Sequence, residues 1–341
     1  MTVHRELDGL VLHGPEFEPV EGRVVVEDGE ITAVEETATD SDDWILPAFV
    51  NAHTHIGDSI AKEAGRGLSL DELVAPPDGL KHRLLRETPR SEMVAAMRES
   101  IAYMRESGTA SFVEFREGGV EGVERLHDAA ADSPVEPVVL GRETVAAMEA
   151  GDGFGASGAR DGNFRTERTA TRAAGKLFGV HAGERDAADV DGALDLDPDF
   201  LVHMVHTHDY HLERVADGDI PIVCCPRSNL VTDVGLPAFD RLAETTTLAL
   251  GTDNVMLNSP SMFREMAVTA KHADLDAPEI LRMATRNGAA IAGREYGLIE
   301  EGRPAKLQVL DGGSHNLVGA RDPVRAVVRR GEVADVREVV L

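Results

Sequence analysis

The chain has 341 residues, of which 42% are hydrophobic, so it is long enough to bury a sizeable core. Its 61 acidic and 34 basic residues leave a formal net charge of −27, which argues against nucleic acid or an anionic membrane surface as a partner. No stretch approaches the run of about 18 apolar residues that spans a bilayer, and the first residues lack the basic flank and apolar stretch of a signal peptide, so we expect a cytoplasmic protein.

Short β-like runs separated by glycine and acidic turns occupy both ends of the chain. In residues 7–47 the pair Asp28-Gly29 stands between two such runs, which is a hairpin signal. The tail from about Gly297 shows the same pattern, with β-like runs at 306–312 and 324–331. We therefore predict a small β-sandwich domain formed by residues 1–47 and 295–341.

Residues 48–294 show a different pattern, in which strands are separated by amphipathic helices. This pattern is typical of a parallel sheet or barrel, and we expect helices at 91–106, 120–131 and 164–175. The first strand belongs to the apolar run 44–50 and continues to His55. Further strands are expected at 109–115, 135–140, 151–158, 176–182, 200–205, 220–225 and 246–251. Eight strands alternating with helices predict an α/β fold, a (β/α)8 TIM barrel of about 250 residues.

His53 and His55 end the first barrel strand. Side chains at i and i+2 of a strand point to the same face, so the two imidazoles can reach one metal ion. The alternative is that they are only two polar residues that close a strand. The first interpretation requires further ligands elsewhere in the chain.

Polar residues follow three later strands, at the barrel end where chemistry takes place. They are His181 and Glu184 after the fifth strand, His203 after the sixth and Asp253 after the eighth. Each alone is compatible with an ordinary polar loop or turn. Together, three imidazoles and one carboxylate can converge on a divalent ion, and such ligands suit zinc, iron(II) or manganese.

These motifs resemble the amidohydrolase superfamily, in its adenosine deaminase and S-adenosylhomocysteine deaminase-like branch (the chlorohydrolase and cytosine deaminase type). The likeness covers nearly the whole chain, in residues 46–55, 181–184, 225–229, 284–290 and 297–302. Two departures, Ala48 for a usual Gly and Lys306 for a usual Asp, lie away from the expected ligands. The chain is also short for these deaminases, whose extra length shapes the substrate loops.

The resemblance implies that His53, His55, His181 and Asp253 hold one divalent ion, with zinc expected and Fe2+ or Mn2+ as alternatives. It implies one ion because relatives with two bridge them by a modified lysine at the end of the fourth strand, and none of the five lysines lies between residues 82 and 175. Lys176, which begins the fifth strand, should lie at the opposite end of the barrel.

The resemblance also implies catalytic roles for Glu184, His203 and Asp253. Hydrolytic deamination needs a water molecule that loses a proton near neutral pH, which a bound divalent ion makes possible. We expect His203 to orient this water, Asp253 to accept its proton and Glu184 to donate a proton to the substrate ring. Alternatively, Glu184 only caps the next helix. Among the nearby histidines we expect His208 and His211 at solvated helix positions.

Arg116, Arg142 and Arg227 follow the second, third and seventh strands and are candidates for binding a carboxylate or phosphate of the substrate. Each alone is compatible with a surface or ion-pair role, as are Asp58 and Glu114.

The leading hypothesis is a metal-dependent amidohydrolase that deaminates a purine-, pyrimidine- or pterin-like heterocycle and releases ammonia. The alternatives are a hydrolase of a cyclic amide or amidine, or of another C–N or C–Cl bond, and a non-catalytic metal-binding scaffold. A scaffold has no need for Glu184 and His203 beside an ion. The expected partner is a small molecule, for which the arginines allow an anionic group, and homo-oligomers are compatible with the sequence. The acidic excess, five lysines and 4% aromatic residues also predict a halophilic protein.

Overall fold

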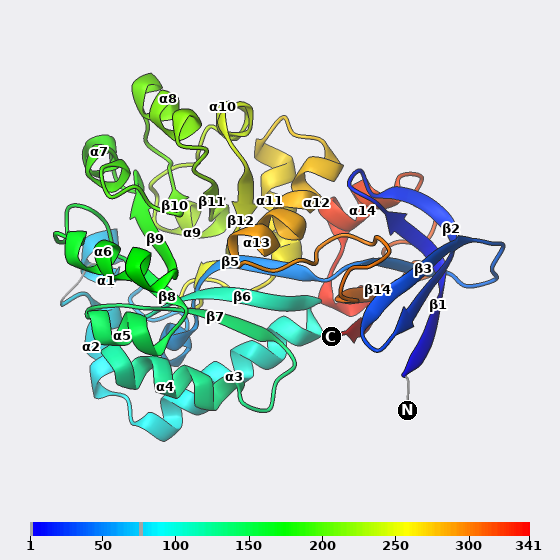
Figure 1. Ribbon diagram of the computed structural model, residues 1–341, viewed down its shortest axis with the longest axis horizontal. Coiled ribbons are helices and arrows are strands. Elements are labelled where there is room, and N and C mark those ends of the chain that lie inside the picture. Colours follow the sequence, from blue (N-terminus) through cyan, green and yellow to red (C-terminus); the bar gives the residue numbers. More distant parts are fainter. Residues whose placement is uncertain (1–2, 75–77) are drawn as a thin grey trace.

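The computed structural model describes residues 3–74 and 78–341. Its strands form two sheets, one of six and one of nine strands. Figure 1 shows the smaller sheet at one end of the long axis and the larger sheet, surrounded by helices, at the other.

The smaller sheet joins the two ends of the chain. Its spatial order is β15-β14-β4-β1-β2-β3, and β4 pairs with both β1 and β14. Its strands are β1 (His4–His13), β2 (Glu18–Glu27), β3 (Glu30–Glu36), β4 (Asp43–Pro47), β14 (Leu307–Asp311) and β15 (Val336–Val340). Alternate residues such as Val24 and Val26 are buried, which gives the sheet one apolar face. The union of the two ends is as predicted, but a β-sandwich is not confirmed, because the described strands of this unit pair in one sheet. The boundaries at residues 47 and 294 stay a prediction.

The predicted β-like run at 324–331 is wrong, because this segment forms helix α14 (Pro323–Arg330). Asp322 accepts a hydrogen bond from the backbone N–H of Arg325, and Pro323 occupies the first helical turn, so both residues favour a helix start. Val324, Val327 and Val328 then lie on one buried face, with the spacing of a helix. The helix packs on α11 and α12 of the larger unit.

The larger sheet is parallel and curls into a barrel. Its order is β12-β11-β10-β9-β8-β7-β6-β5-β13. The strands are β5 (Phe49–His55), β6 (Thr109–Arg116), β7 (Glu136–Gly141), β8 (Gly153–Ala156), β9 (Leu177–Ala182), β10 (Phe200–His203), β11 (Ile222–Cys224), β12 (Leu248–Leu250) and β13 (Asp253–Asn254). The eighth predicted strand corresponds to β12, which pairs with β11, and the short strand β13 that follows it pairs with β5. This second pairing closes the barrel, and the predicted TIM-barrel architecture is confirmed.

Helices follow most barrel strands and cover the outside of the barrel (Figure 1). The three predicted helices are confirmed as α3 (Arg90–Glu106), α4 (Gly119–Ala130) and α6 (Arg165–Ala174). The others are α1 (Leu70–Val74), α2 (Leu80–Glu87), α5 (Val145–Ala150), α7 (Val190–Leu194), α8 (Asp209–Asp217), α9 (Pro226–Val231), α10 (Phe239–Thr245), α11 (Met262–His272), α12 (Ala277–Ala284) and α13 (Arg286–Ile291), with 3₁₀ turns η1 (Ile56–Ala61), η2 (Ala187–Asp189) and η3 (Val333–Asp335). Among the described residues, no helix combines the length and apolarity that a membrane crossing needs.

The barrel interior is filled by side chains below the strand ends. Phe115, Phe200, Val202 and Val223 belong to one buried apolar cluster. The ring of Phe115 also stands edge-on to the imidazoles of His53 and His181. These apolar side chains are therefore closely packed directly beneath the polar residues at the carboxyl ends of the strands.

Candidate metal centre and active site

Four of the predicted residues meet at the carboxyl end of the barrel. His53 and His55 come from β5, His181 from β9 and Asp253 from β13. One ligand atom from each lies within 4.8 Å of the other three, and His53, His55 and Asp253 are buried while His181 is partly buried. Asp253 has φ 55°, in the left-handed region that non-glycine residues avoid. The cluster therefore includes a strained backbone position, of the kind that often lies at functional sites.

Four of the distances within the cluster suit ligands that share one ion. The Nε2 atom of His181 lies 3.2 Å from Nε2 of His53 and 3.4 Å from Nε2 of His55. The Oδ1 atom of Asp253 lies 3.3 Å from Nε2 of His53 and 3.6 Å from Nε2 of His55. Two ligands about 2.0–2.1 Å from a zinc ion, separated by the tetrahedral angle of about 109°, are about 3.3–3.4 Å apart.

Contacts on the outer side of the cluster, a hydrogen bond for His181 and a carboxylate beside His55, favour Nε2 as the ligand atom. The Nδ1 atom of His181 lies 2.8 Å from the carbonyl oxygen of Ala156, and since a carbonyl can only accept, Nδ1 donates and Nε2 of the neutral ring carries a lone pair. The Nδ1 atom of His55 lies 3.0 Å from Oε1 of Glu117, which favours the same tautomer. Two unprotonated nitrogens thus face each other, an arrangement that a cation between them would stabilise.

Burial sets the charge state of these groups. It lowers the pKa of His53 and that of His181, and it lowers the pKa of His55 to about 3, so the imidazoles are neutral near pH 7. Burial alone would raise the pKa of Asp253, but the contacts with His53 bring this pKa well below its usual range. The Oδ2 atom of Asp253 also accepts a hydrogen bond of 2.5 Å from the Ser228 hydroxyl. Three neutral imidazoles and one carboxylate are a donor set that fits a divalent cation.

Glu184 and His203 lie beside the cluster. His203 ends β10 with φ 77°, its Nδ1 lies 3.0 Å from Nδ2 of Asn229, and its Nε2 lies 3.7 Å from Oε2 of Glu184. The Glu184 side chain is 23% exposed, and partial burial raises the pKa of its carboxyl. The capping alternative for Glu184 does not hold, because Asp186 is the residue whose side chain accepts the N–H of Ala188 and caps η2.

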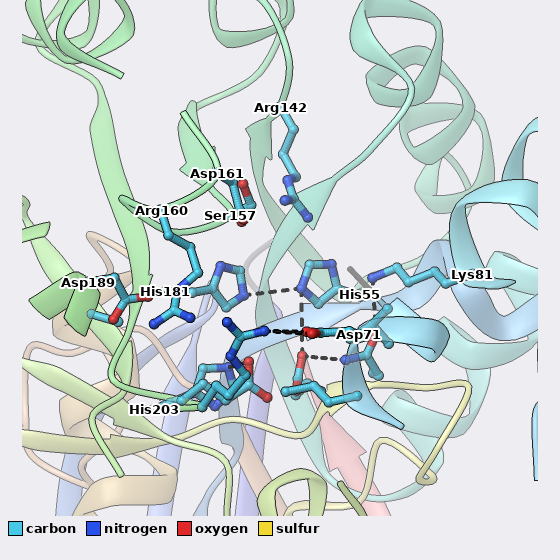
Figure 2. A pocket seen from close by; sticks show the side chains of 17 residues that line it. His55, Asp71, Lys81, Arg142, Ser157, Arg160, Asp161, His181, Asp189 and His203 are labelled. Carbon is cyan, nitrogen blue, oxygen red and sulfur yellow. Dashed lines mark hydrogen bonds and ion pairs between the residues drawn. The ribbon is translucent and has the colours of Figure 1, made fainter. Parts of the chain in front are cut away.

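A cavity of about 110 Å³ opens over these groups. It is lined by His55, His181, His203, Glu184 and Asp253, together with Lys81, Arg142 and Asn254. Figure 2 shows His55 and His181 side by side, with Lys81 and Arg142 reaching toward them from different elements.

The structure separates the three predicted arginines. Arg142 lines the cavity, and its Nη1 donates to Glu117 at 2.8 Å. Arg116 lies 3.4 Å from a carboxylate oxygen of Glu114, and both side chains are buried. Arg227 donates to Glu265 at 2.6 Å. Neither Arg116 nor Arg227 is among the residues that line the cavity, although all three arginines pair with a buried carboxylate.

The other sequence candidates are placed as follows. His208 is exposed, as expected, but His211 is buried, because its Nδ1 accepts the backbone N–H of His208 at the start of α8. Lys176 donates to backbone carbonyls at the end of α5, at the amino end of β9 and away from the cluster. Cys224 and Cys225 are free and buried.

Sequence reasoning missed Glu117, Lys81, Asn254, Ser228 and Asn229. Glu117 directly follows β6, and Asn254 directly follows Asp253, so the strand-end rule could have identified both. Lys81 lies on α2 in the long segment between β5 and α3, where no strand-end signal points to the site.

Comparisons with known proteins agree with this arrangement. The model of the amidohydrolase family matches residues 44–188 and 174–337, and the chain belongs to this family. A relative from Methanothermobacter thermautotrophicus, whose name gives only the class aminohydrolase, is 35% identical over 95% of this chain and 94% of its own length. The 5-methylthioadenosine/S-adenosylhomocysteine deaminase of Halobacterium salinarum is 27% identical over 98% of this chain and 90% of its own.

Solved crystal structures share the fold of this chain. A crystal structure of an adenosine deaminase from Xanthomonas campestris with bound zinc superposes with a TM-score of 0.81, at 20% identity, over 98% of this chain and 91% of that one. The resemblance to the deaminase-like branch of the amidohydrolases, inferred from the motifs, is thereby confirmed.

Proposed function

We propose that this amidohydrolase is a metal-dependent hydrolytic deaminase that replaces an amino group on a small heterocycle and releases ammonia. The observation that carries the proposal is the convergence of three imidazole Nε2 atoms and one carboxylate oxygen within 4.8 Å of one another, with Glu184 and His203 beside them. Membership of the family and the deaminase names of its relatives support the same reaction.

In this proposal His53, His55, His181 and Asp253 hold one divalent ion, with zinc first and Fe2+ or Mn2+ as alternatives. The facing lone pairs and the neutral state of the imidazoles fit such an ion. A bound divalent ion supplies Lewis acidity, which allows a water molecule to lose its proton near neutral pH. The other groups of the site orient this water and move protons.

Glu184 is the proposed proton donor. Partial burial raises the pKa of its carboxyl, so the acid form persists to higher pH than for a solvated glutamate. From the rim of the cavity it can protonate the ring nitrogen beside the carbon that is attacked, where electron density accumulates.

His203 and Asp253 act on the water in this proposal. His203 is held through Nδ1 by Asn229, which leaves Nε2 free to hydrogen-bond the water. Asp253 accepts the proton of the water on Oδ2, because one hydrogen bond from Ser228 leaves a second lone pair there. The same proton then passes to the departing amine.

Arg142 is the proposed contact for an anionic substituent of the substrate. It is the arginine of the predicted three that lines the cavity, and a charge-assisted contact with a carboxylate or phosphate is worth about 1.5–3 kcal/mol. The cytoplasmic location and the salt-adapted surface stay predictions from the sequence, with which a homo-oligomer is also compatible.

Ammonia release by the zinc-loaded protein from a panel of aminated purines, pyrimidines and pterins tests the function. Each compound should be offered with and without a carboxylate or phosphate group, and His53→Ala serves as the inactive control. Mass spectrometry distinguishes the replacement of an amino group by oxygen from the addition of water that opens a ring. Ring opening, or loss of chloride from a chlorinated analogue without any ammonia, would replace deamination by one of the alternative hydrolases.

A further inference from the structure

Three cationic or polarised groups converge on one oxygen of Glu117. Its Oε1 lies 3.0 Å from Nδ1 of His55, 2.9 Å from Nζ of Lys81 and 2.8 Å from Nη1 of Arg142. Glu117 is only 3% exposed, and its other oxygen, Oε2, accepts no hydrogen bond from the part of the chain that the structure describes. Oε1 of this carboxylate therefore faces His55, Lys81 and Arg142 together.

Lys81 links this carboxylate to a second proposed ligand. It is 3% exposed, and besides Glu117 its Nζ donates to Oδ1 of Asn254 at 3.0 Å. Asn254 in turn donates through Nδ2 to Oδ1 of Asp253 at 3.0 Å. A buried ammonium is costly unless it is paired, so the contacts with Glu117 and Asn254 stabilise Lys81 in its position between them.

We propose that Glu117 and Lys81 are positioning residues of the metal centre. Glu117 holds the ring of His55 with the proton on Nδ1 and the lone pair on Nε2, and it makes this imidazole a stronger ligand. Lys81 keeps Glu117 against His55 and Asn254 against Asp253, so that one side chain of α2 aligns ligands from β5 and β13. The inference rests on the proposed metal site, because it assigns these residues to the alignment of that site's ligands.

The chain contains a matched control for this proposal. Glu265 is fully buried and pairs with Arg227 at 2.6 Å, as Glu117 pairs with Arg142. Among the described residues its carboxylate contacts Arg227 and none of the four proposed ligands. Glu265→Gln therefore removes a buried carboxylate from an ion pair without touching the metal centre.

The test is the affinity for zinc, measured by competition with a chelator. Glu117→Gln should weaken zinc binding by about 10- to 100-fold, and Lys81→Met should weaken it in the same direction, while Glu265→Gln should bind as the parent does. Glu117→Asp keeps the charge but withdraws it from His55, so it should also bind more weakly and serves if the Gln variant does not fold. In cobalt-loaded protein, the visible absorption of Glu117→Gln should differ from that of the parent.

A zinc dissociation constant for Glu117→Gln within threefold of the parent, or an equal loss in Glu265→Gln, would overturn the positioning role. The proposed function fails in a different way. In that case the parent itself retains no zinc, or His53→Ala binds zinc as tightly as the parent.

Discussion

Replacing Glu184 with Gln isolates the proton donor from the rest of the site. The substitution keeps the size of the side chain and removes the proton that the carboxyl can give. Loss of a general acid costs about 10²- to 10⁴-fold in kcat, which is about 2.7–5.4 kcal/mol at about 1.36 kcal/mol per tenfold. Glu184 contributes none of the four clustered ligand atoms, so the zinc content should stay normal.

The pH dependence gives a second measure of the same step. Since the pKa of Glu184 is raised, the acid form is present below that pKa, and activity should fall as pH rises through it. The Gln variant has no such group, so this alkaline limb should be absent from its residual activity. A change in metal binding alone would leave the limb in place.

Steady-state ammonia release, with zinc measured on the same samples, is the assay. Glu244→Gln, an exposed position on α10, is the control for a neutralised carboxylate away from the site. Should Glu184→Gln keep its zinc and work within a fewfold of the parent on a true substrate, the assignment of the proton donor is wrong.

Three further predictions concern the metal, pH and salt. Elemental analysis should find one zinc per chain and none in His53→Ala, and a value close to two in the parent would contradict the single site. Burial raises the pKa of Asp58 from its ordinary 3.8 to about 8, so the folded state holds a proton that the unfolded chain releases. The free energy of unfolding of the metal-free protein should therefore fall as pH rises between these values. Asp58→Asn should flatten this dependence, and an unchanged slope in urea melts would refute the reasoning. The melting temperature should rise from dilute buffer to molar salt, as the charge of −27 predicts, and equal stability in both would exclude a halophilic surface.

The sequence correctly predicted which residues the carboxyl ends of the parallel strands bring together. Apolar runs identified the barrel strands, and parallel strands in a closed barrel bring their carboxyl ends to one face. His53, His55, His181 and Asp253 therefore converge although the chain separates the first and the last by two hundred positions. Their roles as ligands still await the measurements proposed above.

The local sequence pattern was less reliable for a segment whose residues are compatible with both a helix and a strand. The valine-rich segment now seen as α14 suits a β-strand by composition. The cap at Asp322 and the burial of one helical face decided otherwise. Similarly, the sequence predicts a solvated position for His211, but this residue is buried, and its Nδ1 accepts the backbone N–H of His208.

Only the tertiary structure decided which charges face the cavity and which pair within the fold. Arg116, Arg142 and Arg227 are equivalent by sequence position, each just beyond a predicted strand, and all three pair with buried carboxylates, yet of these three Arg142 alone lines the cavity. Lys81 reaches the site from α2, because the path of a long connection, rather than any strand-end pattern, sets its direction. Strand periodicity fixes the side of the sheet on which a residue lies, whereas ion-pair partners depend on packing between segments far apart in the chain.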